Sequence, residues 1–248
     1  LSPEIEIIAD DALPLDEKKE LEQCLKSWVD SHINEVLSDL INLTKAKIEN
    51  QYLRALAFQL YENNGVLKRK NVDDIVKLIS KEERKKLWGM GIKIGRYHIY
   101  LPKMLKPKAV ILRTTLWKIY NDISSTLNVP KFGLNFVVNE NFNEKFLLLC
   151  GFARFQDYFV RVDILEKLFI NIIDTTVDRK FKISSEMMNL LGCTKENFFK
   201  LMRLMNYKKS KDSETYYFSP DIKKNKGKLT LNKNKVSPFS KLLALNIK

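Results

Sequence analysis

The side chains with the clearest chemistry lie between residues 84 and 118, a stretch of 35 residues with ten Lys or Arg and no Asp or Glu. Its middle, from Gly89 to Pro107, reads GMGIKIGRYHIYLPKMLKP and adds aromatic side chains to the positive charge. A cluster of unopposed cations repels itself, and a polyanionic partner relieves that repulsion. The chemistry predicted for this block is binding of phosphates, with rings that can stack on unpaired bases.

A β-hairpin over residues 91–101 is expected to position these groups. Apolar and polar residues alternate on both sides of a tight turn with Gly95 at its first central position. The alternation puts Tyr97 in the core, and His98 and Tyr100 on the opposite, exposed face. The alternative is a hairpin whose rings fill the core and whose Lys residues are merely solvated. The candidate nucleic-acid contacts in this block are Lys93, Arg96, His98, Tyr100, Lys103, Lys106, Lys108 and Arg113.

A second basic group lies in residues 184–209. The pattern from 184 to 207 predicts two helices joined by a short turn containing Gly192, and a strand is expected near 216–218. This order is typical of a winged helix-turn-helix, which either binds nucleic acid or is purely architectural. The candidate contacts on or just after the second helix are Lys195, Lys200, Arg203, Lys208 and Lys209.

No catalytic residue, metal ligand or cofactor site is predicted in this chain. The sequence has no GxxxxGK[ST] loop to hold nucleotide phosphates. The spacing Gly89-x-Gly91-x-x-x-Gly95 departs from glycine-rich dinucleotide loops and follows a charged helix where a strand is needed. The two His and three Cys are too scattered in sequence to indicate a metal site.

Charge distribution and cysteine content indicate the cellular compartment that we expect for this chain. The net charge of +13 is segregated: residues 1–83 carry 11 basic and 17 acidic side chains, whereas residues 222–248 carry eight Lys and no acid. The odd number of scattered Cys predicts a reducing, cytoplasmic setting. No apolar run reaches the ~18–20 residues of a membrane helix, so we expect no membrane partner. The chain begins with Leu1 and not Met, which suggests a fragment of a longer protein.

The predicted fold class is α+β, mainly α with small β-hairpins. Residues 163–166 have the spacing of a capping box at the start of a helix. Helices are expected at 16–47, 51–62, 72–80, 81–88, 109–123, 144–150 and 163–175. The expected domains are a helical lobe with the basic hairpin (1–125), a winged-helix-like lobe (126–220), a flexible Lys-rich linker (221–238) and a short C-terminal docking segment (239–248).

Five blocks of the sequence, in order, resemble a known family. They read ALAFQLYENNGVL, WGMGIKIGRYHIYLPKMLKPKAVILRTTLW, VRVDILEKL, MMNLLGCTKENFFKLMRLMNY and SPFSKLLAL, and together they span nearly the whole chain. This pattern is similar to the C-terminal region of bacterial helicase-related proteins, which resemble the mitochondrial degradosome RNA helicase of superfamily II. The resemblance implies an intact protein that unwinds RNA or DNA–RNA duplexes with ATP and Mg²⁺, using RecA-like domains of the same polypeptide. It implies for this chain an accessory role, gripping the strand and closing over the motor.

We therefore expect an accessory region that binds RNA or DNA, single-stranded or being unwound, with little base specificity. The ATPase motor is not contained in these residues. The alternative is a stand-alone winged-helix protein, such as a transcriptional regulator, which would prefer one duplex sequence. A third possibility is an interaction platform whose charge serves an anionic membrane or an acidic partner.

Overall fold

A computed structural model describes residues 3–8, 14–123, 127–138, 143–209 and 215–217. The fold is α+β and mainly helical, as the sequence predicts, and the described part contains three small antiparallel sheets. The described residues all belong to one compact unit, Leu1–Phe218, and a second unit is Ser219–Lys248. The second unit, with the predicted linker and docking segment, lies outside the described residues, as does the boundary expected at 125–126. Among the described helices, none combines the length and apolar character that crossing a bilayer requires.

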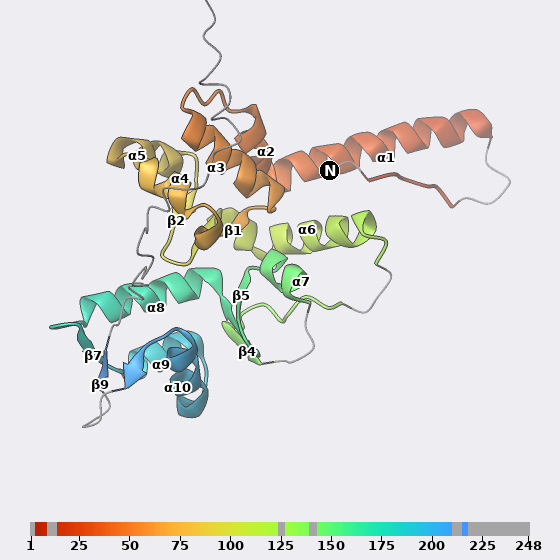
Figure 1. Cartoon of the computed structure of the whole chain (residues 1–248). Helices are drawn as coiled ribbons and strands as arrows, with labels where there is room; N and C mark the ends of the chain where they lie inside the picture. Colours follow the sequence, from red (N-terminus) through yellow and green to blue (C-terminus); the bar gives the residue numbers. More distant parts are fainter. Residues whose placement is uncertain (1–2, 9–13, 124–126, 139–142, 210–214, 218–248) are drawn as a thin grey trace, which may run out of the picture. The chain divides into compact units, whose positions relative to one another are not determined.

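The N-terminal part is a group of helices packed around buried leucines. The single helix predicted over 16–47 is wrong, because Leu37 is buried at φ −102° and ψ 19° and separates two helices. Helix α1 buries Ile33 alone, and Figure 1 shows it extending beyond its contacts with α2 and α6. The helices of this part are α1 (Leu15–Val36), α2 (Ser38–Lys45), α3 (Gln51–Glu62), α4 (Asp73–Leu78) and α5 (Lys81–Gly89), with a 3-10 turn η1 (Arg69–Asn71).

The predicted hairpin is confirmed, and it belongs to a three-stranded sheet. Strand β3 (His98–Tyr100) lies between β1 (Val66–Lys68) and β2 (Lys93–Ile94), and both pairings are antiparallel. One face of β3 packs on the helical cluster through Ile99, and the other packs through Tyr100 on a second buried cluster. Because the strand is central and covered on both faces, all three of its residues are buried.

A second sheet and two helices follow the hairpin. The 3-10 turn η2 (Pro102–Leu105) leads into α6 (Pro107–Tyr120), whose first residue is a proline, a residue well suited to a helix start. Helix α7 (Glu144–Leu149) precedes a meander of β5 (Phe152–Phe155) and β6 (Tyr158–Arg161), and β6 also pairs with β4 (Phe136–Val138). A third buried cluster, centred on Phe146 and Phe159, fills the space between these elements.

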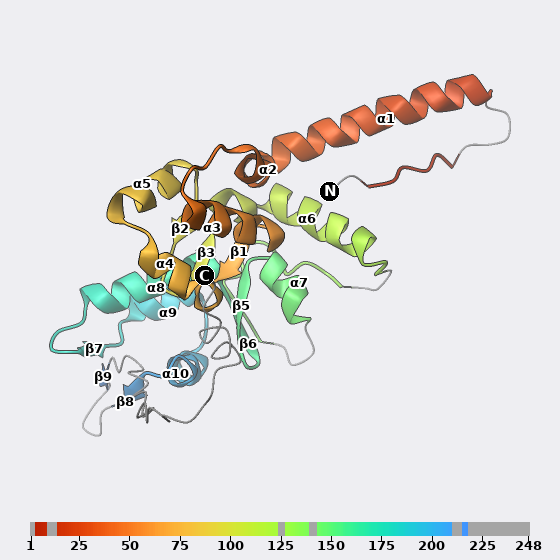
Figure 2. The ribbon, with the colours of Figure 1, turned by 45° about the horizontal axis from the view of Figure 1, so that its top comes forward.

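The C-terminal part has the predicted winged-helix order. The αL glycine Gly192 ends α9 at φ 66°, and the Thr194 hydroxyl caps α10 by accepting from the Asn197 N–H at 3.3 Å. The strands form a sheet in the order β7-β9-β8, which Figure 2 shows beside α10. The elements are α8 (Val162–Asp174), β7 (Lys180–Lys182), α9 (Ser185–Leu191), α10 (Lys195–Leu204), β8 (Lys208–Lys209) and β9 (Thr215–Tyr217).

A carboxylate of α8 holds the tip of the hairpin. The side chain of Glu166, 7% exposed, accepts hydrogen bonds from three successive backbone N–H groups, those of Arg96 at 2.6 Å, Tyr97 at 2.8 Å and His98 at 3.1 Å. The predicted capping box at 163–166 is therefore wrong. Helix α8 already begins at Val162, and its N-cap makes no side-chain hydrogen bond.

The role predicted for Gly95, a turn residue at a first central position, is also wrong. Its φ is not among the positive values that a turn with glycine at the first central position needs. A Cβ at this residue would instead lie 2.2 Å from the Glu166 carboxyl carbon. The glycine is required because the carboxylate approaches the backbone closely. The carbonyl of Gly95 accepts in turn from the Arg69 guanidinium at 2.9 Å.

Replacing Gly95 with Ala should displace the Glu166 carboxylate and lower the free energy of unfolding by about 2 kcal/mol or more, the scale of one hydrogen bond to a charged group. Urea denaturation of the purified native chain and of the variant measures the difference in free energy of unfolding. Gly89→Ala is the matched control, because a Cβ at Gly89 meets nothing within 4 Å and helix propensity favours Ala by up to ~1 kcal/mol. Equal losses in both variants would show that Glu166 does not hold the turn.

Candidate nucleic-acid interface

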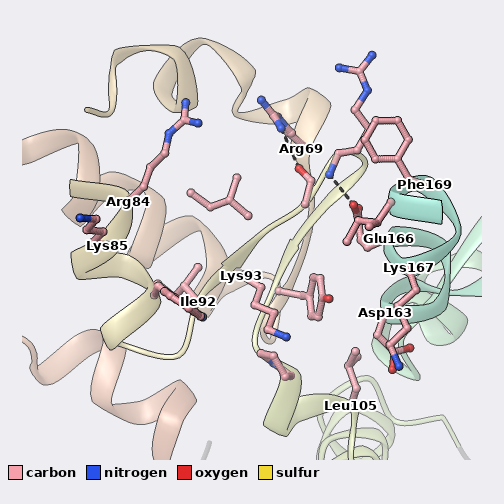
Figure 3. A pocket seen from close by; sticks show the side chains of 17 residues that line it. Arg69, Arg84, Lys85, Ile92, Lys93, Leu105, Asp163, Glu166, Lys167 and Phe169 are labelled. Atoms are coloured by element: carbon pink, nitrogen blue, oxygen red, sulfur yellow. Dashed lines mark hydrogen bonds between the residues drawn. The ribbon is translucent and has the colours of Figure 1, made fainter. Parts of the chain in front are cut away.

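An open hollow of about 800 Å³ lies between α5, the hairpin and α8. Figure 3 shows α5 with Arg84 and Lys85 on one side, Lys93 on the hairpin, and α8 with Lys167 on the other. We call this site the basic hollow, and its basic lining residues are Arg69, Arg84, Lys85, Lys93, Arg96 and Lys167.

The two carboxylates that line the basic hollow are already engaged. Glu166 holds the hairpin turn, and Asp163 is paired with Arg161 at 2.5 Å. Six basic groups against two acids leave a formal charge of +4 at this site. One of the six, Arg69, also lies 3.4 Å from Asp73. The other five belong to no ion pair among the described residues, so they can contact phosphate groups without first breaking a carboxylate contact.

Aromatic groups accompany the charge. The indole of Trp88, at the end of α5, lines the hollow and is 68% exposed. The Arg96 guanidinium lies 5.7 Å from the centroid of the Phe169 ring, an arrangement that orients the cation by its attraction to the ring face. An exposed indole beside phosphate-binding cations can stack on an unpaired base of any sequence.

Two of the sequence-predicted contacts, Lys93 and Arg96, lie in the basic hollow and are exposed. Neither belongs to an ion pair among the described residues. Lys103 does not join them, because its ammonium lies 2.8 Å from an Asp39 carboxylate oxygen. The exposed Lys106 and Lys108 lie just before and at the start of α6 and do not line the hollow.

The prediction that His98 and Tyr100 face solvent is wrong. Each is 5% exposed, because β3 is covered by a packed cluster on either face. Burial raises the pKa of Tyr100 to about 12, with the negative charges of Glu166 and Asp163 as smaller causes. Neither side chain is placed to stack on a base, although an edge of Tyr100 reaches the hollow.

Arg113 is also misassigned as a phosphate contact. It is 2% exposed, and its guanidinium donates to the backbone carbonyls of Asn64 and Met104. Burial lowers its pKa to about 10, so the group stays charged at neutral pH. Arg113 therefore ties α6 to the end of α3 and to η2, and its role is structural.

The five candidate contacts of the winged helix are exposed and form a separate group. The ammonium groups of Lys195 and Lys209 each lie 5.6 Å from the centroid of the Phe199 ring, so α10 and β8 present paired cations over one aromatic side chain. The remaining three are Lys200, Arg203 and Lys208. None of the five lines the basic hollow.

Sequence reasoning missed four cations of the basic hollow and its indole. Arg84, Lys85 and Trp88 lie within the acid-free block, and treating α5 as part of the same surface would have included them. Arg69 and Lys167 lie outside that block. They reach the site through the pairing of β1 with β3 and the contact of α8 with the hairpin, which no local pattern encodes.

Neither a metal cluster nor a recognised relative identifies the site. Within the described ranges, no group of three or more His, Cys, Asp or Glu side chains is arranged to hold a metal ion. Comparison with known protein families, curated proteins and solved structures finds no match to this chain.

The buried His98 makes stability depend on pH. Burial, aided by the charge of Lys68, which faces it across the sheet, lowers its pKa to about 4. In the unfolded chain the imidazole has an ordinary pKa of about 6.5, so only the unfolded state is protonated between these values. The free energy of unfolding should therefore fall as the pH is lowered from about 6.5 to about 4.

In His98→Leu this pH-dependent contribution should be absent. The difference in unfolding free energy between the native chain and the variant should change by up to about 1.4 kcal/mol per pH unit within the window. Urea denaturation at several pH values measures it. Parallel pH profiles for the two proteins would mean that folding does not change the pKa of His98.

Proposed function

We propose that this chain binds single-stranded RNA through the basic hollow, with little base specificity, as the accessory region of an ATP-dependent helicase. The observation that carries the proposal is the convergence of six basic side chains from α5, the hairpin, the β1–η1 junction and α8 on one open site. Apart from Arg69, which pairs with Asp73, these cations belong to no ion pair among the described residues. Folding alone gives no reason to gather unpaired cations, whereas a phosphate backbone does.

The aromatic groups favour a single strand over a duplex. In a duplex the base faces are stacked on each other and are inaccessible to Trp88. A single strand can place its phosphates against the hairpin and α8 while one base stacks on the exposed indole at the rim. The contacts are to phosphates and to a ring face, so they carry little sequence information.

The helicase role rests on the sequence resemblance. An accessory region that grips the product strand lets a motor keep hold of it between steps, while ATP and Mg²⁺ bind to the RecA-like domains. The basic hollow would supply that grip, and Glu166 would keep the hairpin cations in place during it.

A stand-alone winged-helix regulator is the second candidate, and one observation favours it. Helix α10, which occupies the position of a recognition helix, exposes Lys195, Lys200 and Arg203. A regulator should select one duplex sequence over scrambled competitors, and substitutions on α10 should abolish that selection. Binding of single-stranded RNA that is unaffected by Lys200→Gln and Arg203→Gln would favour the basic hollow.

Neutralising the hollow should weaken RNA binding and its salt dependence together. In the triple variant Lys93→Gln, Arg96→Gln, Lys167→Gln, the slope of log affinity against log salt for a uridine oligomer should become less negative by about 2. Each phosphate contact on a single strand contributes about −0.7 to that slope. Fluorescence anisotropy at several salt concentrations measures both quantities.

The matched control is Lys103→Gln, combined with Lys106→Gln and Lys108→Gln. These three lysines have the same sequence neighbourhood and charge but do not line the basic hollow. Their removal should change the slope by less than half as much. An equal effect of the two triple variants would mean that net charge, and not the hollow, determines binding.

A further inference from the structure

A second hollow, of about 750 Å³, has the opposite chemistry. It lies between the N-terminal segment at residues 3–8 and the last turns of α3 and α6. We call it the acidic–aromatic hollow, and the residues that define it are Glu4, Tyr61, Glu62, Trp117 and Tyr120.

The carboxylates of this hollow are available to a ligand. Glu4 and Glu62 are exposed and belong to no ion pair among the described residues. The basic residue in the lining, Arg113, is buried, and its guanidinium donates to the carbonyls of Asn64 and Met104. The nearby Lys118 directs its ammonium to the Phe146 ring, at 5.6 Å, and does not line the hollow.

Two helices add to the negative potential. Helix α3 ends at Glu62 and α6 ends at Tyr120, so the C-terminal turns of both helices line the same hollow. The macrodipole makes the C-terminal end of a helix favourable for a cation. The guanidinium of Arg113 already donates to one carbonyl just past the end of α3, that of Asn64.

The aromatic walls suit a cation as well as a carboxylate does. Tyr120 is 89% exposed, and Tyr61 and Trp117 line the same hollow half-buried. The face of such a ring attracts a guanidinium or ammonium group. A guanidinium can stack on a ring and pair with a carboxylate through two N–H groups at once, so Arg fits better than Lys.

We infer that the acidic–aromatic hollow docks an Arg-rich segment of a partner protein. Its volume is in the range of sites that hold a drug-sized ligand, which is more than one side chain needs and enough for a short stretch of peptide. Nucleic acid is disfavoured here because the carboxylates repel phosphates. This inference does not depend on RNA binding by the basic hollow, because the two sites share no lining residue.

The test uses the full chain and a fluorescently labelled peptide, Arg-Gly-Arg-Gly-Arg-Gly-Arg, with blocked ends. Anisotropy titration should show binding, and Glu4→Gln with Glu62→Gln should weaken it about tenfold. Tyr120→Leu, at a side chain too exposed to support the core, should weaken it several-fold. The control pair Glu17→Gln and Glu20→Gln removes the same charge from the exposed part of α1 and should leave affinity within twofold.

The location of binding can be read from fluorescence. In a Trp28→Phe, Trp88→Phe variant, Trp117 is the one remaining tryptophan. The peptide should change its emission, and a Gly-Ser peptide of equal length should not. A lack of peptide binding, an unchanged Trp117 signal, or equal weakening by the α1 pair would overturn the inference. Uridine-oligomer affinity should be unaltered in Glu4→Gln, Glu62→Gln, and a loss there would equally contradict the separation of the two sites.

Discussion

The contact of the Glu166 carboxylate with three backbone N–H groups of the hairpin turn is the interaction on which the basic hollow depends. A buried carboxylate is costly unless its lone pairs are satisfied, and charge-assisted hydrogen bonds to backbone donors satisfy them. Because Glu166 belongs to α8 and the donors belong to the turn at 96–98, one side chain fixes two segments about 70 residues apart. The cations of α8 and of the hairpin therefore face the same space.

Most acidic side chains of the described part lie outside the lining of this site. Acidic side chains are concentrated before residue 84, and the carboxylate of Asp39 neutralises Lys103 without reaching the hollow. Glu4 and Glu62 lie in the other hollow, where two helix C-termini reinforce their charge. The winged helix adds a third charged surface on α10 and β8, where Lys195 and Lys209 share one aromatic ring. The described part thus carries separate surfaces of positive and negative charge.

Local patterns in the sequence predicted the elements better than their surroundings. The helix period and Gly192 were enough to predict the winged-helix order, and the two-residue alternation predicted the hairpin. The burial of His98 and Tyr100 could not be predicted, because it depends on the two buried clusters that pack on the two faces of β3. Gly95 shows the same limit: a turn glycine is read from sequence as a matter of φ, whereas here its role comes from a distant carboxylate.

For the candidate site as well, the sequence indicated some of the lining residues and not others. Positive charge free of acids pointed to the hairpin, and two of its cations, Lys93 and Arg96, line the hollow. Charge alone does not distinguish an exposed cation from a structural one such as Arg113, whose guanidinium donates hydrogen bonds to backbone carbonyls. Arg69 and Lys167 could be added only once the pairing of β1 and the position of α8 were known.

The most direct measurement is to map where RNA touches the chain. A uridine oligomer carrying 4-thiouridine can be crosslinked to the protein by light and the modified peptides identified by mass spectrometry. The account predicts crosslinks in residues 84–96 and 161–170, above all at the exposed ring of Trp88. Crosslinks confined to α10 and β8, or spread evenly over all exposed lysines, would contradict it.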